Sequence, residues 1–443
     1  MTPGSSLQMF KYFHQIWQSK ELKYKILFTL FALVVFRFAA HITVPGVNLD
    51  ALGNIFQQNA LLGVFSAFTG GSMENFSIVL MGLSPYINAS IIIQLMTVVI
   101  PKLENLSKEG EEGRRKLNHY TRLLTIPFAL LQSYGMIVLL NNSSQATGLP
   151  LISDVTDPTI ILPIMIIVTA GTVFMMWLGE QITAIGIGNG ISLLIFASII
   201  SGMPTVVGRM LSLGQGGDTT KLSYFIIFVI ITIIMLLAVV LITEGQRNIP
   251  ITYATRATGA KAEKAGLPIR VNQAGMIPII FAISMITFPS VMAQFFQTSD
   301  SKTLQDIATF ILQYFNASQP SYVYMIFYFI LIILFSFFYV SVTFNPEQVA
   351  ENIQKRGGFI PGIRPGSQTA EYLQKVSNRM NLFGGTFIAV IAVVPILFTK
   401  FTTLSSSDLI ISGSGLIIVV GVVLDLMRQI NAQLVMHDYD KLY

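Results

Sequence analysis

Side chains that could carry out chemistry are few and scattered in this chain of 443 residues. It has no cysteine, so disulfides, thiol catalysis and cysteine-ligated metals are excluded. The four histidines lie at the chain termini or at the ends of apolar segments. There is no His-Glu-x-x-His motif, no pair of aspartates within an apolar segment and no phosphate-binding loop. The sequence therefore predicts no catalytic site, no bound metal and no cofactor.

The composition points to a membrane. Hydrophobic residues make up 53% of the chain and charged residues only 11%, against about a quarter in soluble domains. A water-soluble globule of this size could not cover so much apolar surface. The apolar segments are apolar on all sides, which excludes the alternating strands of a β-barrel. The pI of about 9.2 is typical of basic inner loops and does not indicate nucleic-acid binding.

Ten stretches are predicted to span the membrane, because each has about 20 mostly apolar residues. They are 26–42, 76–99, 120–140, 159–178, 185–203, 222–243, 273–296, 323–343, 382–398 and 409–427. Four of them contain a Gly or Pro that we expect to interrupt the helix: Pro85, Gly190, Pro278 and Gly384. If the N-terminus is cytoplasmic, 22 Lys and Arg fall on inner segments and 4 on outer ones. This asymmetry predicts that both termini are cytoplasmic.

Three of the inner segments are long, polar and basic, namely 100–119, 244–272 and 344–381. Attraction to anionic lipid could account for such loops. The third contains Pro361-Gly-Ile-Arg-Pro-Gly366, whose Pro-Gly pairs fix a turn with Arg364 at its tip. A rigid, exposed tip with one cation is more typical of a docking point.

An internal repeat relates the two halves of the chain. Residues 82–89 and 275–282 both read Gly-x-x-Pro-x-Ile-x-Ala, and Gly188-Asn-Gly190 with Gly413-Ser-Gly415 gives a weaker match. The predicted topology runs the paired spans in opposite directions. We therefore expect two five-helix halves, 1–203 and 204–443, related by a pseudo-twofold axis in the membrane plane. Chance similarity among common membrane residues is the alternative.

The predicted centre between these halves is apolar. It offers Leu83, Ile87, Ile191, Ile195, Ile280, Ile417 and Ile418. A secondary transporter would place ionisable groups there, but Arg37 and Asp425 lie near the ends of their spans. An apolar constriction favours a gated pore. An ion-coupled transporter is the second hypothesis, and a membrane-embedded enzyme is the third.

Two further features concern the way such a pore could be closed. Residues 61–68 are apolar but too short to span, so they form either a re-entrant plugging helix or an amphipathic interfacial helix. Polar side chains occur in two of the repeat-related spans: Asn88, Ser90, Gln94, Asn272 and Gln273. They either hold helices together or form a wettable seam between two helices that part.

Over nearly its whole length the sequence resembles the SecY family of translocon channel subunits. The most specific stretches are 77–95 and 177–195, and Phe344-Asn-Pro346 and Pro361–Gly366 are also similar to family segments. The resemblance implies an all-α polytopic fold of ten transmembrane helices with a plug helix. It also implies a channel that translocates unfolded polypeptides across the cytoplasmic membrane and releases transmembrane segments sideways into it.

The resemblance also implies roles for particular residues. The implied pore ring is Leu83, Ile87, Ile191, Ile195, Ile280 and Ile418, and the implied plug spans 61–75 with Leu62, Val64, Phe65 and Phe68. The implied lateral gate contains Asn88, Ser90, Gln94, Asn272 and Gln273. Arg256 and Arg364 would be the principal docking contacts in 244–272 and 344–381.

Partners follow from the same resemblance. They are the small subunits SecE and SecG, the motor ATPase SecA, the ribosome, polypeptides that carry signal sequences, and the surrounding bilayer. Leu83 stands where the family often has Ile, and Lys261 and Lys264 replace a more Arg-rich stretch, so the detailed docking contacts are expected to differ. The chain has no phosphate-binding motif of its own, so the partners must supply the energy.

Overall fold

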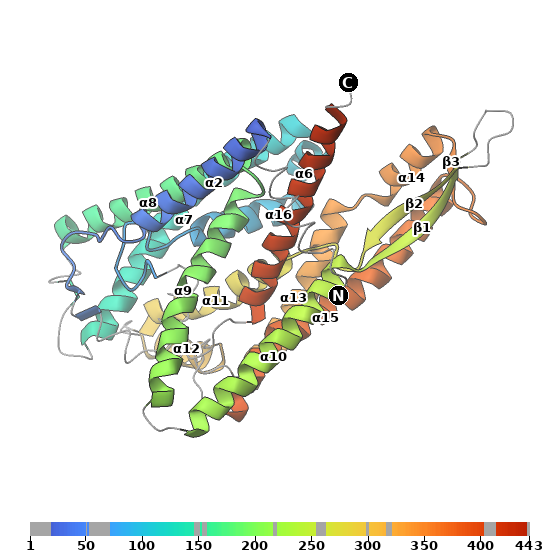
Figure 1. The fold of residues 1–443 in the computed structure, drawn as a ribbon. Helices are drawn as coiled ribbons and strands as arrows, with labels where there is room; N and C mark the ends of the chain where they lie inside the picture. Colours follow the sequence, from blue (N-terminus) through green and yellow to red (C-terminus); the bar gives the residue numbers. More distant parts are fainter. Residues whose placement is uncertain are drawn as a thin grey trace.

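The computed structural model describes residues 19–49, 51–52, 71–145, 151–152, 157–215, 219–253, 263–297, 301–315, 321–402 and 413–440. Within these ranges the protein is a bundle of helices with one small sheet. Figure 1 shows the sheet at one end of the molecule, away from α12.

The described helices and strands follow one another along the chain, with the helices far outnumbering the strands. The helices are α2 (Lys20–Ala39), α5 (Ser84–Val99), α6 (Pro101–Lys108), α7 (Glu111–Gln145), α8 (Pro158–Ile185), α9 (Gly190–Gln215), α10 (Thr219–Glu244), α11 (Ile277–Gln297), α12 (Lys302–Tyr314), α13 (Tyr322–Thr343), α14 (Pro346–Lys355), α15 (Ser367–Phe401) and α16 (Gly413–Asp440). The strands are β1 (Gln246–Tyr253), β2 (Glu263–Arg270) and β3 (Gly358–Phe359).

Each of the ten predicted spans contains a helix, which confirms the all-α polytopic fold. In the described part, six helices are long and apolar enough to cross a membrane, and α5 with α6 makes a seventh if the pair, bent by 102°, counts as one span. The apolar parts of α9 and α11 are shorter, and α2 carries Lys23, Lys25 and Arg37. Ten membrane crossings therefore remain a prediction, since length and composition alone support fewer.

The predicted interruptions are mostly helix starts. Pro85 lies in the first turn of α5, Gly190 is the first residue of α9, and Pro278 is the second residue of α11. Proline suits a first turn, because the N–H group that it lacks would have no partner inside the helix. Residues 76–83, which were predicted as helix, form turns instead. Only Gly384 lies within its helix, α15.

The two large basic segments fold together, although the sequence suggested separate loops. Strands β1 and β2 pair antiparallel from Gln246↔Arg270 to Tyr253↔Glu263, and β3 pairs with β1 at Thr252↔Phe359. Side chains from the sheet, α14 and the start of α15 share one apolar core. It includes Ile249, Ile251, Ile269, Ala350, Ile353, Ile360 and Leu373. Because the sheet, α14 and the start of α15 share this core, the two basic segments form one structural unit.

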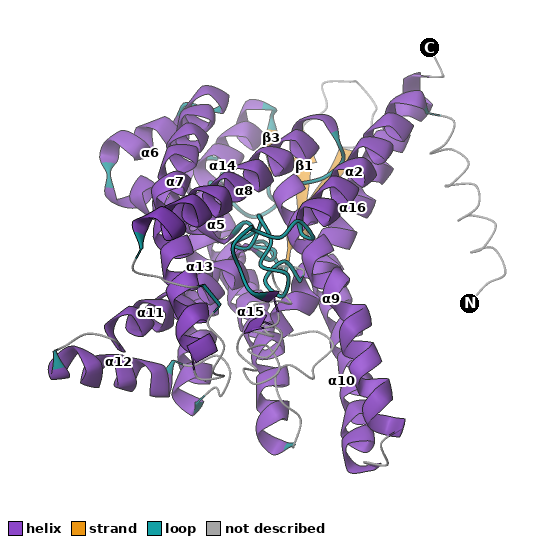
Figure 2. Cartoon of the chain, turned by 90° about the vertical axis from the view of Figure 1, so that its left-hand side faces the viewer, coloured by secondary structure: helices purple, strands orange, loops and turns teal. Residues whose placement is uncertain are grey.

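Long helices cross the rest of the molecule from the sheet end to the far end, and α12 lies crosswise at that far end (Figure 2). The outermost long helix is α10, since only 17% of its most apolar stretch is buried, against 33–44% in the other five candidate spans. Large apolar side chains such as Ile230, Ile234 and Leu241 are exposed along α10. Exposure of this extent is expected of a surface that faces lipid.

Candidate functional site

The six apolar residues of the implied pore ring lie together in one apolar cluster. They come from the start of α5, α9, α11 and α16, which are far apart in the sequence. Leu83 and Ile418 are buried, whereas Ile87, Ile191, Ile195 and Ile280 are partly buried. Ile417, although next to Ile418, packs into a neighbouring cluster instead. The structure therefore brings together all six side chains that the resemblance named.

A cavity of about 150 Å³ adjoins this cluster. Five of the six residues line it, together with apolar side chains such as Phe36, Met175 and Ile283. Its polar lining consists of the hydroxyl side chains of Ser84, Ser198, Ser284 and Thr287. The hydroxyls of Ser198 and Thr287 donate to carbonyls of their own helices, over 2.9 and 2.8 Å. These two hydroxyl donors are therefore already satisfied within their own helices. Apart from Ser84 and Ser284, the other residues that line the cavity are apolar.

The first repeat places two of the isoleucines in matching positions. Gly82 and Gly275 both have positive φ, +52° and +65°, and a helix begins two residues after each of them. Positive φ is easy for glycine and rare for other residues. Ile87 and Ile280 each lie five residues beyond the glycine, in the first turns of α5 and α11. The two copies of the Gly-x-x-Pro motif thus have a similar backbone geometry.

The second repeat also has glycines at matched positions, but here the glycines make close contacts with a neighbouring helix. Gly190 is the first residue of α9, and Gly413 is the first described residue of α16. A Cβ on Gly190 would collide with the Gly179 carbonyl of α8, and one on Gly413 with the Ile391 carbonyl of α15. This shared packing favours pairing Gly190 with Gly413, whereas the sequence match pairs Gly190 with Gly415. Ile195 and Ile418 again lie five residues beyond their glycines.

Three of the five predicted gate residues lie on α5, which packs against α11. Asn88, Ser90 and Gln94 are partly buried, and the Gln94 amide donates to the Ser90 hydroxyl over 3.1 Å. This bond shows that the polar side chains of α5 pair along their own helix.

Asn272 and Gln273 have other partners than α5. Both precede α11 rather than open it. The Asn272 carbonyl oxygen accepts from the Gly275 N–H over 2.9 Å, and that of Gln273 accepts from the Ser377 hydroxyl of α15 over 2.7 Å. The structure therefore places these amides at the joint between α11 and α15. These bonds agree with the first of the two alternatives, in which the amides hold helices together.

The hydroxyl side chains of α11 were missed by sequence reasoning. Ser284 and Thr287 line the cavity with Ile280 and Ile283. Their spacing of four and seven residues from Ile280 puts them on the same face of a helix. That periodicity, counted from the repeat motif, was the signal that could have found them.

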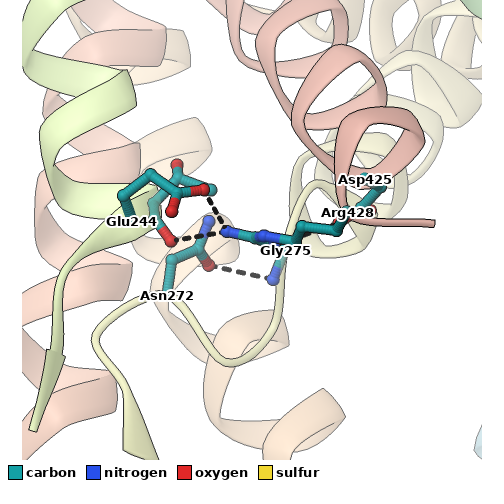
Figure 3. Close-up of polar contacts among 6 residues, drawn as sticks. Glu244, Asn272, Gly275, Asp425 and Arg428 are labelled. Atoms are coloured by element: carbon teal, nitrogen blue, oxygen red, sulfur yellow. Dashed lines mark hydrogen bonds and ion pairs between the residues drawn. The ribbon is translucent and has the colours of Figure 1, made fainter. Parts of the chain in front are cut away.

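A charged network holds the last turn of α10 against the middle of α16 (Figure 3). From α16, Arg428 pairs with Glu244 of α10 at 2.6 Å and with Asp425 at 3.2 Å. The same guanidinium donates to the Thr243 carbonyl over 3.2 Å. A cation is favourable there, because the last carbonyls of a helix carry partial negative charge. Asp425, which the sequence placed near the inner end of its span, thus belongs to an ion network.

Residues 271–276, which lead into α11, start beside the end of α10. The Val271 N–H donates to the Gly245 carbonyl over 2.9 Å, directly after Glu244. In Figure 3 the Asn272–Gly275 bond lies beside the Arg428–Glu244 pair. The entry to α11 is therefore fixed to α10 through the backbone and to α15 through Gln273.

Arg364 lies at the tip of a turn, as its Pro-Gly surroundings predicted. Gly362 and Gly366 have φ of +82° and +99°, and the Ile363 N–H donates to the Ile360 carbonyl over 3.0 Å. The Arg364 carbonyl accepts from the Thr369 hydroxyl over 2.9 Å, while its side chain is exposed. Hydrogen bonds on either side of Arg364 thus fix the turn, which presents the Arg364 guanidinium to solvent.

The remaining predicted site residues lie outside the described residues. They are Leu62, Val64, Phe65, Phe68 and Arg256, with Lys261 beside the last. Lys264 lies in β2. Among the described residues, no three His, Asp or Glu side chains gather as they would around a metal ion.

Known proteins resemble this chain along nearly its whole length. A family model named SecY matches residues 77–427. The protein translocase subunit SecY of Halalkalibacterium halodurans is 40% identical over 439 residues, which cover 97% of this chain and 99% of the relative. The chain belongs to the SecY family. A second SecY, from Pseudomonas aeruginosa, is 41% identical over 429 residues, 95% of this chain and 93% of the relative.

The SecY fold is also found among solved structures. A structure of a protein-conducting channel superimposes with a TM-score of 0.63 at 19% identity, covering 93% of this chain and 92% of the other. Sec61 in a canine ribosome–channel complex gives 0.60 at 18% identity, with the same coverage. As a SecY family member, this chain is a multi-pass membrane protein and not an enzyme. The family assignment decides against the ion-coupled transporter and the membrane-embedded enzyme.

The network around Arg428 makes a testable prediction about stability. In a double-mutant cycle with Glu244→Gln and Arg428→Met, we expect a coupling free energy of about 1 kcal/mol, because Arg428 is partly shielded and has three partners. The control cycle is Glu351→Gln with Lys355→Met, an exposed pair on α14. Free energies of unfolding in mild detergent measure both. A coupling no larger than that of the control pair would contradict the prediction.

Proposed function

We propose that this chain is the central, protein-conducting subunit of a translocase in the cytoplasmic membrane. It would pass unfolded polypeptides across the bilayer and release transmembrane segments sideways into it. One observation carries the proposal: six apolar side chains at the starts of four helices meet in one cluster, and the described residues that line the adjoining cavity include no charged side chain. The relatives support it, since they are named translocase subunits. A solved structure with a similar fold is that of a protein-conducting channel.

The proposed channel has two halves, residues 1–203 and 204–443. The matched backbone geometry at Gly82 and Gly275, and at Gly190 and Gly413, supports this division. Each half then contributes isoleucines to the neck at equivalent positions. The starts of α5 and α9 supply one side, and α11 and α16 supply the other.

The proposed pore ring is Leu83, Ile87, Ile191, Ile195, Ile280 and Ile418. Such a ring suits a pore that must pass chains of any sequence yet hold back ions. Fixed polar ligands would bind some passing side chains and stall them. Flexible aliphatic side chains give no such preference, and a narrow apolar neck excludes ions because water leaves it.

The proposed lateral gate is the contact between α5 and α11. Asn88, Ser90 and Gln94 of α5 and the hydroxyls of Ser284 and Thr287 of α11 would be wetted when the helices part. Asn272 and Gln273 would then belong to the fixed joint at the start of α11, where they bond to Gly275 and Ser377. Residues 61–75, with Leu62, Val64, Phe65 and Phe68, would form the plug.

Docking is proposed at the unit built by 244–272 and 344–381, with Arg256 and Arg364 as principal contacts. Its shared apolar core supports this, because a partner can push against a rigid body. The proposed partners are SecA and the ribosome at this unit, with SecE and SecG completing the complex. Both termini would be cytoplasmic, on the same side as the sheet.

The pore ring predicts the conductance of the resting channel. Ile280→Asp should open a persistent ion leak, because a carboxylate draws water into the neck. Ile417→Asp is the matched control, since Ile417 packs in the neighbouring cluster. Single-channel conductance of the reconstituted complex without substrate measures both. The ring would be wrong if Ile280→Asp stayed as tight as the parent channel, or if the control leaked equally.

The gate predicts which helix pairs must separate. Cysteines at Ile91 of α5 and Ile279 of α11, which share an apolar cluster, should cross-link and block export. A linked pair at Phe281 and Phe335 is the control, because these rings lie 5.7 Å apart and join α11 to α13 away from the seam. The chain has no native cysteine. Export through the 91–279 cross-link at the control rate would rule out opening between α5 and α11.

The docking unit predicts a position-specific charge effect. Arg364→Glu should lower ATP-driven export by about tenfold or more, which corresponds to about 1.4 kcal/mol of lost partner binding. Arg356→Glu makes the same charge change at the exposed end of α14 and should have a smaller effect. Export rates and co-purification of the partner are measured for both. Equal losses would mean that overall charge, rather than the Arg364 tip, is recognised.

A further inference from the structure

Helix α12 (Lys302–Tyr314) has two chemically different sides that the channel function does not use. Its 13 residues reach about 20 Å, too short to cross a bilayer. Apolar residues recur at helical spacing on one side and polar residues occupy the other, and Thr303 in the first turn is a polar residue on the apolar side. The apolar set is Leu304, Ile307, Ala308, Phe310 and Ile311, and the polar set is Lys302, Gln305, Asp306, Thr309 and Gln313.

Burial divides the apolar side into two strips. Ala308 is fully buried against the rest of the protein. Leu304, Ile307 and Phe310, spaced three residues apart, are 37%, 50% and 59% exposed. Gln305, Asp306 and Thr309 are exposed as well, on the polar side. The helix thus shows the surroundings an apolar strip and a polar strip side by side, and neither is covered by described residues.

The position of α12 matches the edge of a membrane. It lies crosswise to the long helices at the end opposite the sheet (Figures 1 and 2). Its last residue, Tyr314, accepts a hydrogen bond on its carbonyl from Ser321, over 2.7 Å, just before α13 begins. At that level the Lys400 ammonium lies 5.2 Å from the centre of the Tyr322 ring. Aromatic rings and lysines gather where a bilayer meets water.

The exposed apolar strip also continues the apolar surface of the neighbouring spans. Phe315, directly after α12, packs edge-on against Phe327 of α13 at 5.5 Å. The adjoining ends of α11 and α13 expose Phe296, Tyr322 and Ile326 at 43%, 62% and 62%. These side chains belong to helices of a multi-pass membrane protein, so their exposed faces meet lipid. The strip on α12 extends that same surface.

We propose that α12 lies in the bilayer interface on the side opposite the sheet. Leu304, Ile307 and Phe310 enter the acyl-chain region, and Gln305, Asp306 and Thr309 face water. An amphipathic helix binds in this plane in proportion to the apolar area that it buries. Because α12 packs on α11, the lipid also holds the far end of the proposed gate helix, and this last point rests on the proposed function.

Spin labels on single cysteines test the depth of α12, and the chain provides a background without cysteine. Labels at Ile307 and Phe310 report on the apolar strip. Labels at Gln305 and Thr309, on the neighbouring polar strip, are the matched controls. The full complex is reconstituted in vesicles of phosphatidylethanolamine and phosphatidylglycerol. Collision rates with oxygen, which concentrates in lipid, and with a water-soluble nickel chelate are compared.

We expect the ratio of oxygen to nickel collisions to be several-fold higher at 307 and 310 than at 305 and 309. Equal ratios on both strips would overturn the proposal, because the helix would then lie in water. Low collision rates with both reagents at 307 and 310 would also overturn it, since a protein partner would then cover the strip. No translocating substrate is needed, so these outcomes do not depend on whether the chain is a channel.

A second experiment tests the link to the gate. Ile307→Asp should expel the apolar strip from lipid, and Thr309→Asp places the same charge on the polar strip. We expect Ile307→Asp, and not Thr309→Asp, to change the rate of cross-linking between cysteines at Ile91 and Ile279 several-fold. If the depth result holds while both variants cross-link like the parent, α12 is a lipid anchor without influence on α11, and that part of the proposal is wrong.

Discussion

The contact among aliphatic side chains at the start of α5, α9, α11 and α16 is the interaction on which the rest of the structure depends. Four helices from distant parts of the chain must approach one another for Ile87, Ile195, Ile280 and Ile418 to meet. The glycines five residues before each of them make this possible. Two supply positive φ for a sharp entry, and two allow a helix start to lie directly on the backbone of a neighbouring helix.

Polar contacts are placed away from this centre, where they fix the helices that surround it. Arg428 ties α16 to α10, and Gln273 ties the entry of α11 to Ser377 of α15. Deeper in the same joint, the Ser336 hydroxyl donates to the fully buried Asn381 over 2.7 Å. Hydrogen bonds in a low-dielectric interior are strong and directional. They give the start of α11 a fixed position, while the aliphatic contacts at the neck can slide and re-form.

The fold and the central cluster could be predicted from the sequence, because both depend on patterns of residue types along the chain. Long apolar stretches predict helices, and the Gly-x-x-Pro motif with the family resemblance identified Leu83, Ile87 and Ile280 as members of one group. The close contacts of Gly190 with α8 and of Gly413 with α15 favour a different register for the second repeat, and no short motif encodes such contacts. The partner of Gln273, Ser377 of α15, is set by tertiary packing and could not be predicted from the sequence, whereas Asn272 accepts from the N–H of Gly275, three residues further on.

The central claim is that the isoleucines at the four matched positions close one dry neck. The most direct test is the reaction of single cysteines at 87, 195, 280 and 418 with a charged, membrane-impermeant thiol reagent added from either side of the membrane. All four should be unreactive in the resting channel and become reactive when a translocating polypeptide is stalled inside. Rapid reaction of any of them in the resting channel would show that the neck is already wet, and would contradict the claim.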